Sequence, residues 1–121
     1  MRITGNRGEW SELYALIRLM YTGKLYAADE NVKRIDDVYF PILRILRNHA
    51  TPDQIDFIIH ENNVDVVLAG DKVSSIDKEQ LAKISRLIYT GILSGSDRAF
   101  EIQGAPAAME EMHIDRISAA S

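Results

Sequence analysis

The segment from Glu9 to Thr22 limits what this chain can fold into, because a helix over it is apolar on nearly every side. At about 100° per residue, one narrow polar stripe is formed by Ser11, Ala15, Arg18 and Thr22. The remaining positions are mainly large and apolar: Trp10, Leu13, Tyr14, Leu16, Ile17, Leu19, Met20 and Tyr21. Such a helix needs a core around it and leaves only one edge in water. The run Asn6-Arg7-Gly8-Glu9 predicts a capping box at its start, and Gly23 predicts a left-handed residue at its end.

Two short stretches with alternating apolar residues predict a β-hairpin further along the chain. They are Ile55–His60 and Val64–Ala69, with Asn62-Asn63 between them, and asparagine tolerates the positive φ of a tight turn. A two-residue turn places Ile59 opposite Val66 and gives one buried face, formed by Phe57, Ile59, Val66 and Leu68. His60 is then expected to pair with Asp65 across the hairpin. The alternative is a helix that begins at Thr51-Pro52-Asp53-Gln54, which is also a helix-start sequence.

Five further elements are expected: an extended piece (Lys24–Ala28), a strand (Val38–Leu46), a second long helix (Lys78–Thr90), a short helix (Ala105–Met112) and a final strand (His113–Ala119). Pro41 is placed at an edge or a bulge of its strand. In the second long helix Asp77 and Gln80 form the cap and Gly91 marks the end. Its buried stripe is formed by Leu81, Ile84, Leu87 and Ile88. The expected fold class is α+β, a single domain over residues 1–121 with an N-terminal helix, a β-hairpin or sheet and a second long helix.

Composition limits the class of protein without naming a function. The 121 residues are 46% hydrophobic and 26% charged, which are ordinary values for a folded globular domain. The sequence has no cysteine, so a disulfide scaffold and a thiolate zinc site are excluded, and a reducing cytoplasm is consistent with it. We expect no contact with a membrane, since no apolar run approaches the ~20 residues that crossing a bilayer requires. The formal charge of −4 weighs against an isolated nucleic-acid-binding domain, which usually carries a basic face.

Glu9 and Glu12 are the most informative charges, because neither lies on the polar stripe of the first helix. They project from neighbouring turns, and Glu12 aligns with Leu16 and Leu19. A carboxylate on a core-facing side has to be paired, hydrogen-bonded, metal-bound or placed where the core opens into a cleft. The capping box can account for Glu9, whereas capping does not account for Glu12.

The histidines and the basic residues give weaker signals. The 3 histidines lack the spacing of a zinc site, and the sequence has no P-loop, dinucleotide fingerprint or serine-hydrolase motif. Basic residues occur in small groups, such as Lys83 and Arg86, which are usually solvated surface. Arg44 and Arg47, together with His49, form the best candidate for contact with a DNA backbone, because guanidinium groups match phosphate geometry.

Three stretches of the sequence together resemble the start of HpaII-type restriction endonucleases. They are Gly5-Asn6-Arg7-Gly8-Glu9-Trp10-Ser11-Glu12-Leu13-Tyr14, Gly23-Lys24-Leu25-Tyr26-Ala27-Ala28-Asp29 and Val38-Tyr39-Phe40-Pro41-Ile42. The similarity is strongest over residues 5–29 and fair to about residue 46, and beyond that it is a loose match of strands and a helix. At the other end, Ile114–Ser121 is similar to the strand that leads into a serine/lysine turn and the metal-binding aspartate of a PD-(D/E)xK nuclease core.

This resemblance implies the N-terminal part of a Mg²⁺-dependent type II endonuclease that cleaves double-stranded DNA at a palindrome of the C-C-G-G type. It implies a bacterial restriction–modification system in the cytoplasm, and the palindrome favours a homodimer. Many nucleases of this fold add a glutamate from the helix that precedes the core sheet. By that resemblance Glu12 is the candidate catalytic carboxylate and metal ligand, with Glu9 as the second candidate.

One departure from the family pattern concerns the catalytic residues. The D…(D/E)-x-K constellation is absent from the 121 residues, because Asp71-Lys72 and Asp77-Lys78-Glu79 lack the expected strand context. We therefore expect residues after 121 to complete the catalytic core, and the 121-residue chain alone to be inactive. The competing hypothesis is a non-enzymatic, acidic α+β module that binds protein partners and resembles restriction enzymes only locally.

Overall fold

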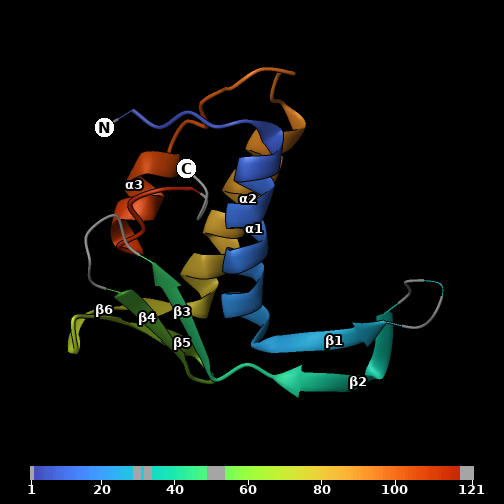
Figure 1. The fold of residues 1–121 in the computed structure, drawn as a ribbon, viewed down its shortest axis with the longest axis vertical. Coiled ribbons are helices and arrows are strands. Elements are labelled where there is room, and N and C mark those ends of the chain that lie inside the picture. The colour runs from blue at the N-terminus through green and yellow to red at the C-terminus, as the bar shows by residue number, and fades with distance from the viewer. Residues whose placement is uncertain (1, 29–30, 32–33, 49–53, 118–121) are drawn as a thin grey trace.

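In the part of the chain that the structure describes, three helices and two antiparallel sheets make up the fold (Figure 1). The computed structural model describes residues 2–28, 31, 34–48 and 54–117. The helices are α1 (Arg7–Thr22), α2 (Lys78–Leu93) and α3 (Ala105–Glu111). A two-stranded sheet is formed by β1 (Lys24–Ala28) and β2 (Arg34–Pro41). A four-stranded sheet, in chain order, is formed by β3 (Arg44–Asn48), β4 (Gln54–Ile59), β5 (Asn63–Leu68) and β6 (Asp71–Asp77).

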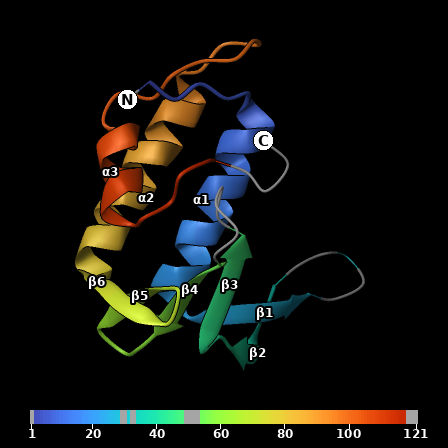
Figure 2. The same ribbon diagram turned by 60° about the vertical axis from the view of Figure 1, so that its left-hand side comes forward.

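The helices stand together over the four-stranded sheet. α1 and α2 run side by side, α3 lies next to α2, and the sheet lies across one end of this group (Figures 1 and 2). The β1–β2 ribbon projects from the same end of α1, away from the larger sheet. This is the mixed α+β architecture that the sequence predicts. None of the helices in the described ranges is both long enough and apolar enough to cross a membrane.

α1 has the predicted cap at each end. The Asn6 side chain accepts a hydrogen bond from the Glu9 N–H at 2.8 Å, and Glu9 Oε1 accepts one from the Asn6 N–H at 3.1 Å. At the other end Gly23 adopts a φ of 64°, and its N–H donates to the Leu19 carbonyl oxygen at 2.8 Å. These bonds satisfy backbone groups that a helix leaves open, and they determine where α1 begins and ends.

The predicted β4–β5 hairpin is confirmed, and the helical alternative is wrong wherever this segment is described. The predicted register, however, is wrong by two residues, because Ile59 pairs with Val64 rather than with Val66. The turn has the expected length but lies one residue earlier, at Glu61-Asn62: the His60 N–H donates to the Asn63 carbonyl oxygen, and Asn63 already belongs to β5. A shift of two residues keeps each side chain on its predicted face, so the apolar face still packs into the core.

His60 pairs with Asp65, as predicted, with Nε2 and Oδ2 2.9 Å apart. Lys72 of β6 approaches the same carboxylate, with its Nζ 3.3 Å from Oδ1. The His60 hydrogen bond is the largest cause of a pKa of Asp65 below its usual range, and Lys72 lowers that pKa further. Because Val64 and Val66 point into the core, Asp65 and its partners lie on the opposite face of the sheet.

Residues 38–46 do not form one strand, so this prediction is wrong. β2 ends at Pro41, β3 begins at Arg44, and the two strands belong to different sheets. Proline has no N–H for a strand ladder, so pairing stops there. The chain then turns back to α1, because the Ile42 N–H donates to the Gly23 carbonyl oxygen at 2.8 Å. The projecting ribbon and the larger sheet therefore join at the end of α1.

α2 is longer than predicted, because Gly91 does not end it. The helix continues to Leu93, with Ser94 at its C-cap. A Cβ on Gly91 would lie 2.6 Å from side-chain atoms of Ile102, so a glycine lets Ile102 pack closely against the helix. Leu87 was expected in the buried stripe of α2 but is 36% exposed.

The end of the described chain also differs from the prediction. α3 is confirmed, but residues 113–117 form a turn and a bend rather than a strand, and residues 118 and 119 lie outside the described part. Ile114 and Ile117 are nevertheless buried, which ties this segment to the core. The sequence does not predict β6 either, because Val73 and Ile76 are its only large apolar residues.

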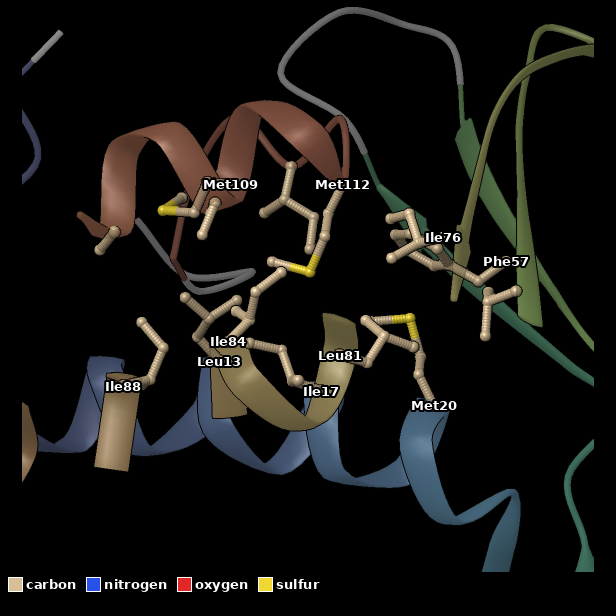
Figure 3. Packing of buried hydrophobic residues seen from close by; sticks show 14 of the residues in the cluster. Leu13, Ile17, Met20, Phe57, Ile76, Leu81, Ile84, Ile88, Met109 and Met112 are labelled. Atoms are coloured by element: carbon tan, nitrogen blue, oxygen red, sulfur yellow. The ribbon is translucent and has the colours of Figure 1, made fainter. Parts of the chain in front are cut away.

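One hydrophobic core joins the helices to the four-stranded sheet (Figure 3). Its α1 side chains have no exposed surface, and they are Trp10, Leu13, Ile17 and Met20. Opposite them lie buried residues of α2, the sheet and the α3 region, including Leu81, Ile84, Ile88, Phe57, Val66, Ile76, Met109 and Met112. The flexible side chains of Met20 and Met112 reach into the space between helices and sheet, where unbranched thioethers fill irregular gaps well (Figure 3).

Gly91→Ala should lower the free energy of unfolding by about 1–3 kcal/mol, because the added Cβ would overlap Ile102. At an exposed helix position the same change would stabilise the protein by about 1 kcal/mol. The sign of the change in the free energy of unfolding therefore shows whether Ile102 packs against Gly91. Denaturant unfolding of the variant and the parent measures this difference in the free energy of unfolding. In an Ile102→Ala background the loss caused by Gly91→Ala should disappear. A more stable Gly91→Ala protein would contradict the close packing.

Candidate functional site

Arg47 lies where α1, β3 and the segment after α3 meet. On β3 it follows the same alternation as Ile45, which packs against the core, so its side chain lies on the helix side of the sheet. Its Nη2 donates a hydrogen bond to the carbonyl oxygen of Arg116 at 2.9 Å. The edge strand of the sheet is thereby tied to residues 114–117.

Two carboxylates lie close enough to Arg47 to act on it electrostatically. Burial is the largest influence and lowers the pKa of Arg47, whereas the charges of Glu12 and Asp115 oppose that effect. Arg116 adds a second positive charge, which lowers the pKa of Arg47 further. An arginine stays charged in spite of such a shift. We call Glu12, Arg47, Asp115 and Arg116 the Arg47 cluster.

One buried donor of Arg47 lacks an acceptor among the described residues. Nη1 is buried, and nothing among the described residues accepts a hydrogen bond from it. Leaving a buried donor unsatisfied costs about 1–3 kcal/mol, and more when the group is charged. The position therefore favours an acceptor, and a guanidinium group matches the oxygens of a phosphate especially well.

Glu12 does not lie on the core-facing side of α1, so its predicted core-facing position is wrong. The helix buries Trp10 and Leu13 on either side of it in sequence, but Glu12 itself is exposed. Leu16 and Leu19, with which it aligns, are only half-buried. Its position beside Arg47 is the feature that now connects it to a site.

Glu9, Arg44 and His49 are not brought into this cluster by the described contacts. The carboxylate of Glu9 closes the capping box with Asn6. Arg44 lies on the other face of β3 from Arg47, because side chains alternate along a strand. There its Nη2 is 2.7 Å from Oδ2 of Asp56, and this partner raises the pKa of Arg44. His49 lies outside the described residues, and Arg44 and Arg47 do not form one surface.

The described residues alone do not fit a metal site. No group of three or more histidine, cysteine, aspartate or glutamate side chains in the described ranges is placed to hold an ion. Asp71 and Lys72 do lie on a strand, β6, contrary to expectation, and Asp77 is its last residue. Neither Asp71 nor Asp77 begins a (D/E)-x-K sequence. Lys72 is paired with Asp65 on the outer face of the sheet.

Asp115 and Arg116 are not among the site residues predicted from the sequence. Both stand between Ile114 and Ile117, which are each 3% exposed. A charged pair between two buried anchors, in a segment without regular structure, is held in place against the core. That pattern is the signal by which the sequence could have pointed to them.

A profile of the HpaII restriction endonuclease family matches residues 6–121. The type II restriction enzyme HpaII of Haemophilus parainfluenzae is 29% identical over 120 residues, which are 98% of this chain and 33% of that enzyme. The chain thus spans about a third of the length of this curated relative. No solved structure matches it significantly.

The family match bears directly on the two hypotheses drawn from the sequence. It covers residues 6–121 and not only the N-terminal motifs, so the expectation of a merely local similarity is wrong. The N-terminal helix, the sheet and the segment that carries Asp115 all fall within it. The chain belongs to the HpaII restriction endonuclease family.

Proposed function

We propose that this chain is the N-terminal part of a type II restriction endonuclease whose catalytic core is completed by residues after 121. Support comes from the family match and from the relative, of which the matched region is 33%. The (D/E)-x-K residues that a PD-(D/E)xK core requires are not in this sequence, so the proposal assigns them to the remainder of the enzyme. The complete enzyme would hydrolyse double-stranded DNA at a palindrome of the C-C-G-G type in the bacterial cytoplasm. A homodimer would match the two-fold symmetry of that site.

The observation that carries this proposal is the Arg47 cluster. It brings Glu12 of α1 and Asp115 of the last described segment to the same arginine. Hydrolysis of a phosphodiester places growing negative charge on the phosphoryl and leaving oxygens as water attacks in line. Arg47 is held through Nη2, and its buried Nη1 lacks an acceptor among the described residues. A movement of the guanidinium group when DNA binds would let Nη1 donate to such an oxygen, and the two carboxylates offset the cost of keeping the charge partly buried.

Mg²⁺ is part of the proposal for the complete enzyme. The ion would lower the pKa of a bound water and neutralise charge on the phosphate. Mg²⁺ is usually held by one or two carboxylates together with waters, so Glu12 would supply one ligand and the assigned (D/E)-x-K residues the others. Arg47 and Asp115 would then border the metal site and bind the substrate beside it.

Glu12→Gln in the full-length enzyme should lower the cleavage rate at least about tenfold, or ~1.4 kcal/mol of barrier, and leave the thermal midpoint nearly unchanged. Glu12 is exposed, so the isosteric change removes a charge without disturbing the core. Glu110→Gln, at an exposed position of α3, is the matched control and should cleave at the parental rate. A folded Glu12→Gln enzyme with full activity would reduce Glu12 to a surface charge.

The purified 121-residue chain should not cleave DNA in Mg²⁺, and it should bind DNA at most weakly and in a salt-sensitive way. The reason is that a carboxylate and an arginine without the (D/E)-x-K residues cannot activate a water. A plasmid that carries one C-C-G-G site, incubated with stoichiometric protein, provides the measurement. Cutting at a single defined site would show that the catalytic residues lie within residues 1–121.

A further inference from the structure

A groove between the C-terminal half of α1 and the N-terminal half of α2 is rich in positive charge. It has a volume of about 520 Å³ and is lined by Tyr21, Lys78, Glu79, Ala82, Lys83 and Arg86. Arg18 stands beside it, with its guanidinium carbon 5.5 Å from the centre of the Tyr21 ring. We call this surface the α1–α2 groove, and its four basic residues the groove cations: Arg18, Lys78, Lys83 and Arg86.

Among the described residues the groove cations have no acidic partner, unlike several basic residues elsewhere on the surface. Arg2 is paired with Glu101 and Lys72 with Asp65 on other surfaces of the protein. Within the part of the chain that the structure describes, none of the four groove cations forms an ion pair. Among the described lining residues Glu79 is the one carboxylate, so the groove is basic on a chain whose net charge is −4. Positive charge that is concentrated and not neutralised favours an anionic partner.

We propose that the α1–α2 groove binds the sugar–phosphate backbone of DNA. This inference rests on the proposed endonuclease function and adds a contact surface to it. Lys78 and Arg86 are about 12 Å apart along the axis of α2, at about 1.5 Å of rise per residue. At about 3.4 Å of rise per nucleotide, one DNA strand carries about three to four phosphates over that length. The phenol of Tyr21 adds a neutral hydrogen-bonding group of a kind that contacts phosphate oxygens.

The groove and the Arg47 cluster lie on opposite flanks of α1. The rings of Tyr14 and Tyr89 are 5.6 Å apart, so α2 packs along the flank of α1 that includes Tyr21. Glu12 faces the other flank, where Arg47 lies. DNA in the groove is therefore held away from the bond that the Arg47 cluster would contact. Such a surface positions the duplex and contributes affinity that does not depend on sequence.

The salt dependence of DNA binding by the full-length protein tests this inference. Lys83→Gln combined with Arg86→Gln changes two exposed side chains, so the thermal midpoint should be preserved. Each lost phosphate contact reduces the magnitude of the slope of log K against log salt concentration by about 0.9. The slope of the double variant should therefore be smaller in magnitude than that of the parent by about 1 to 2. The loss should be equal on duplexes with and without a C-C-G-G site.

The matched control is Arg2→Gln combined with Lys72→Gln, which removes two charges from exposed residues that are ion-paired elsewhere. It should leave the slope unchanged. An unchanged slope in the groove variant, or an equal loss in the control, would overturn the inference and leave the endonuclease function standing. Parent protein that neither binds nor cleaves DNA would instead contradict the proposed function itself.

Discussion

Burial of one face of α1 is the constraint on which the rest of the structure depends. The four core residues of this face have no exposed surface: Trp10, Leu13, Ile17 and Met20. Full burial of one such side chain stabilises a fold by about 1.5–3 kcal/mol, so this helix can hold several elements around it. The indole N–H of Trp10 also donates to the Phe100 carbonyl oxygen at 3.0 Å, which fixes the loop after α2. Gly5 pairs with Phe100 as an isolated bridge and extends the same link to the start of the chain.

Packing against α1 also explains why the candidate site forms. A Cβ on Gly5 would overlap the side chain of Ile117, so a glycine is needed there for the last described segment to lie close. Asp115 and Arg116 are held beside the start of α1 as a result, and the Arg47 hydrogen bond joins them to the edge strand. The site thus depends on three segments that meet through the core, and no local motif contains it.

Local chemistry was predictable from the sequence, and contacts between distant segments were not. The capping box and Gly23 determine the ends of α1 through neighbours within a few residues, and both were predicted correctly. Gly91 has the same residue type and the same helical context as Gly23, but Ile102 decides its role. A helical projection could not place Glu12, because α2 and the C-terminal segment decide which flank of α1 is covered. Arg47 was a candidate for its guanidinium alone, and its carboxylate neighbours come from segments more than thirty residues away in sequence.

A double-mutant cycle between Glu12 and Arg47 tests the central claim, that both residues act in one DNA-cleaving site. Single-turnover cleavage rates of the full-length enzyme would be measured for Glu12→Gln, Arg47→Lys and the combined variant, each with a normal thermal midpoint. If the two residues share a site, removing one changes what the other can contribute, and the effects are not additive in free energy. We expect the combined loss to be smaller than the product of the two single losses. A combined loss of cleavage rate equal to the product of the two single losses would contradict this account. Full cleavage by the Arg47→Lys enzyme would contradict it as well.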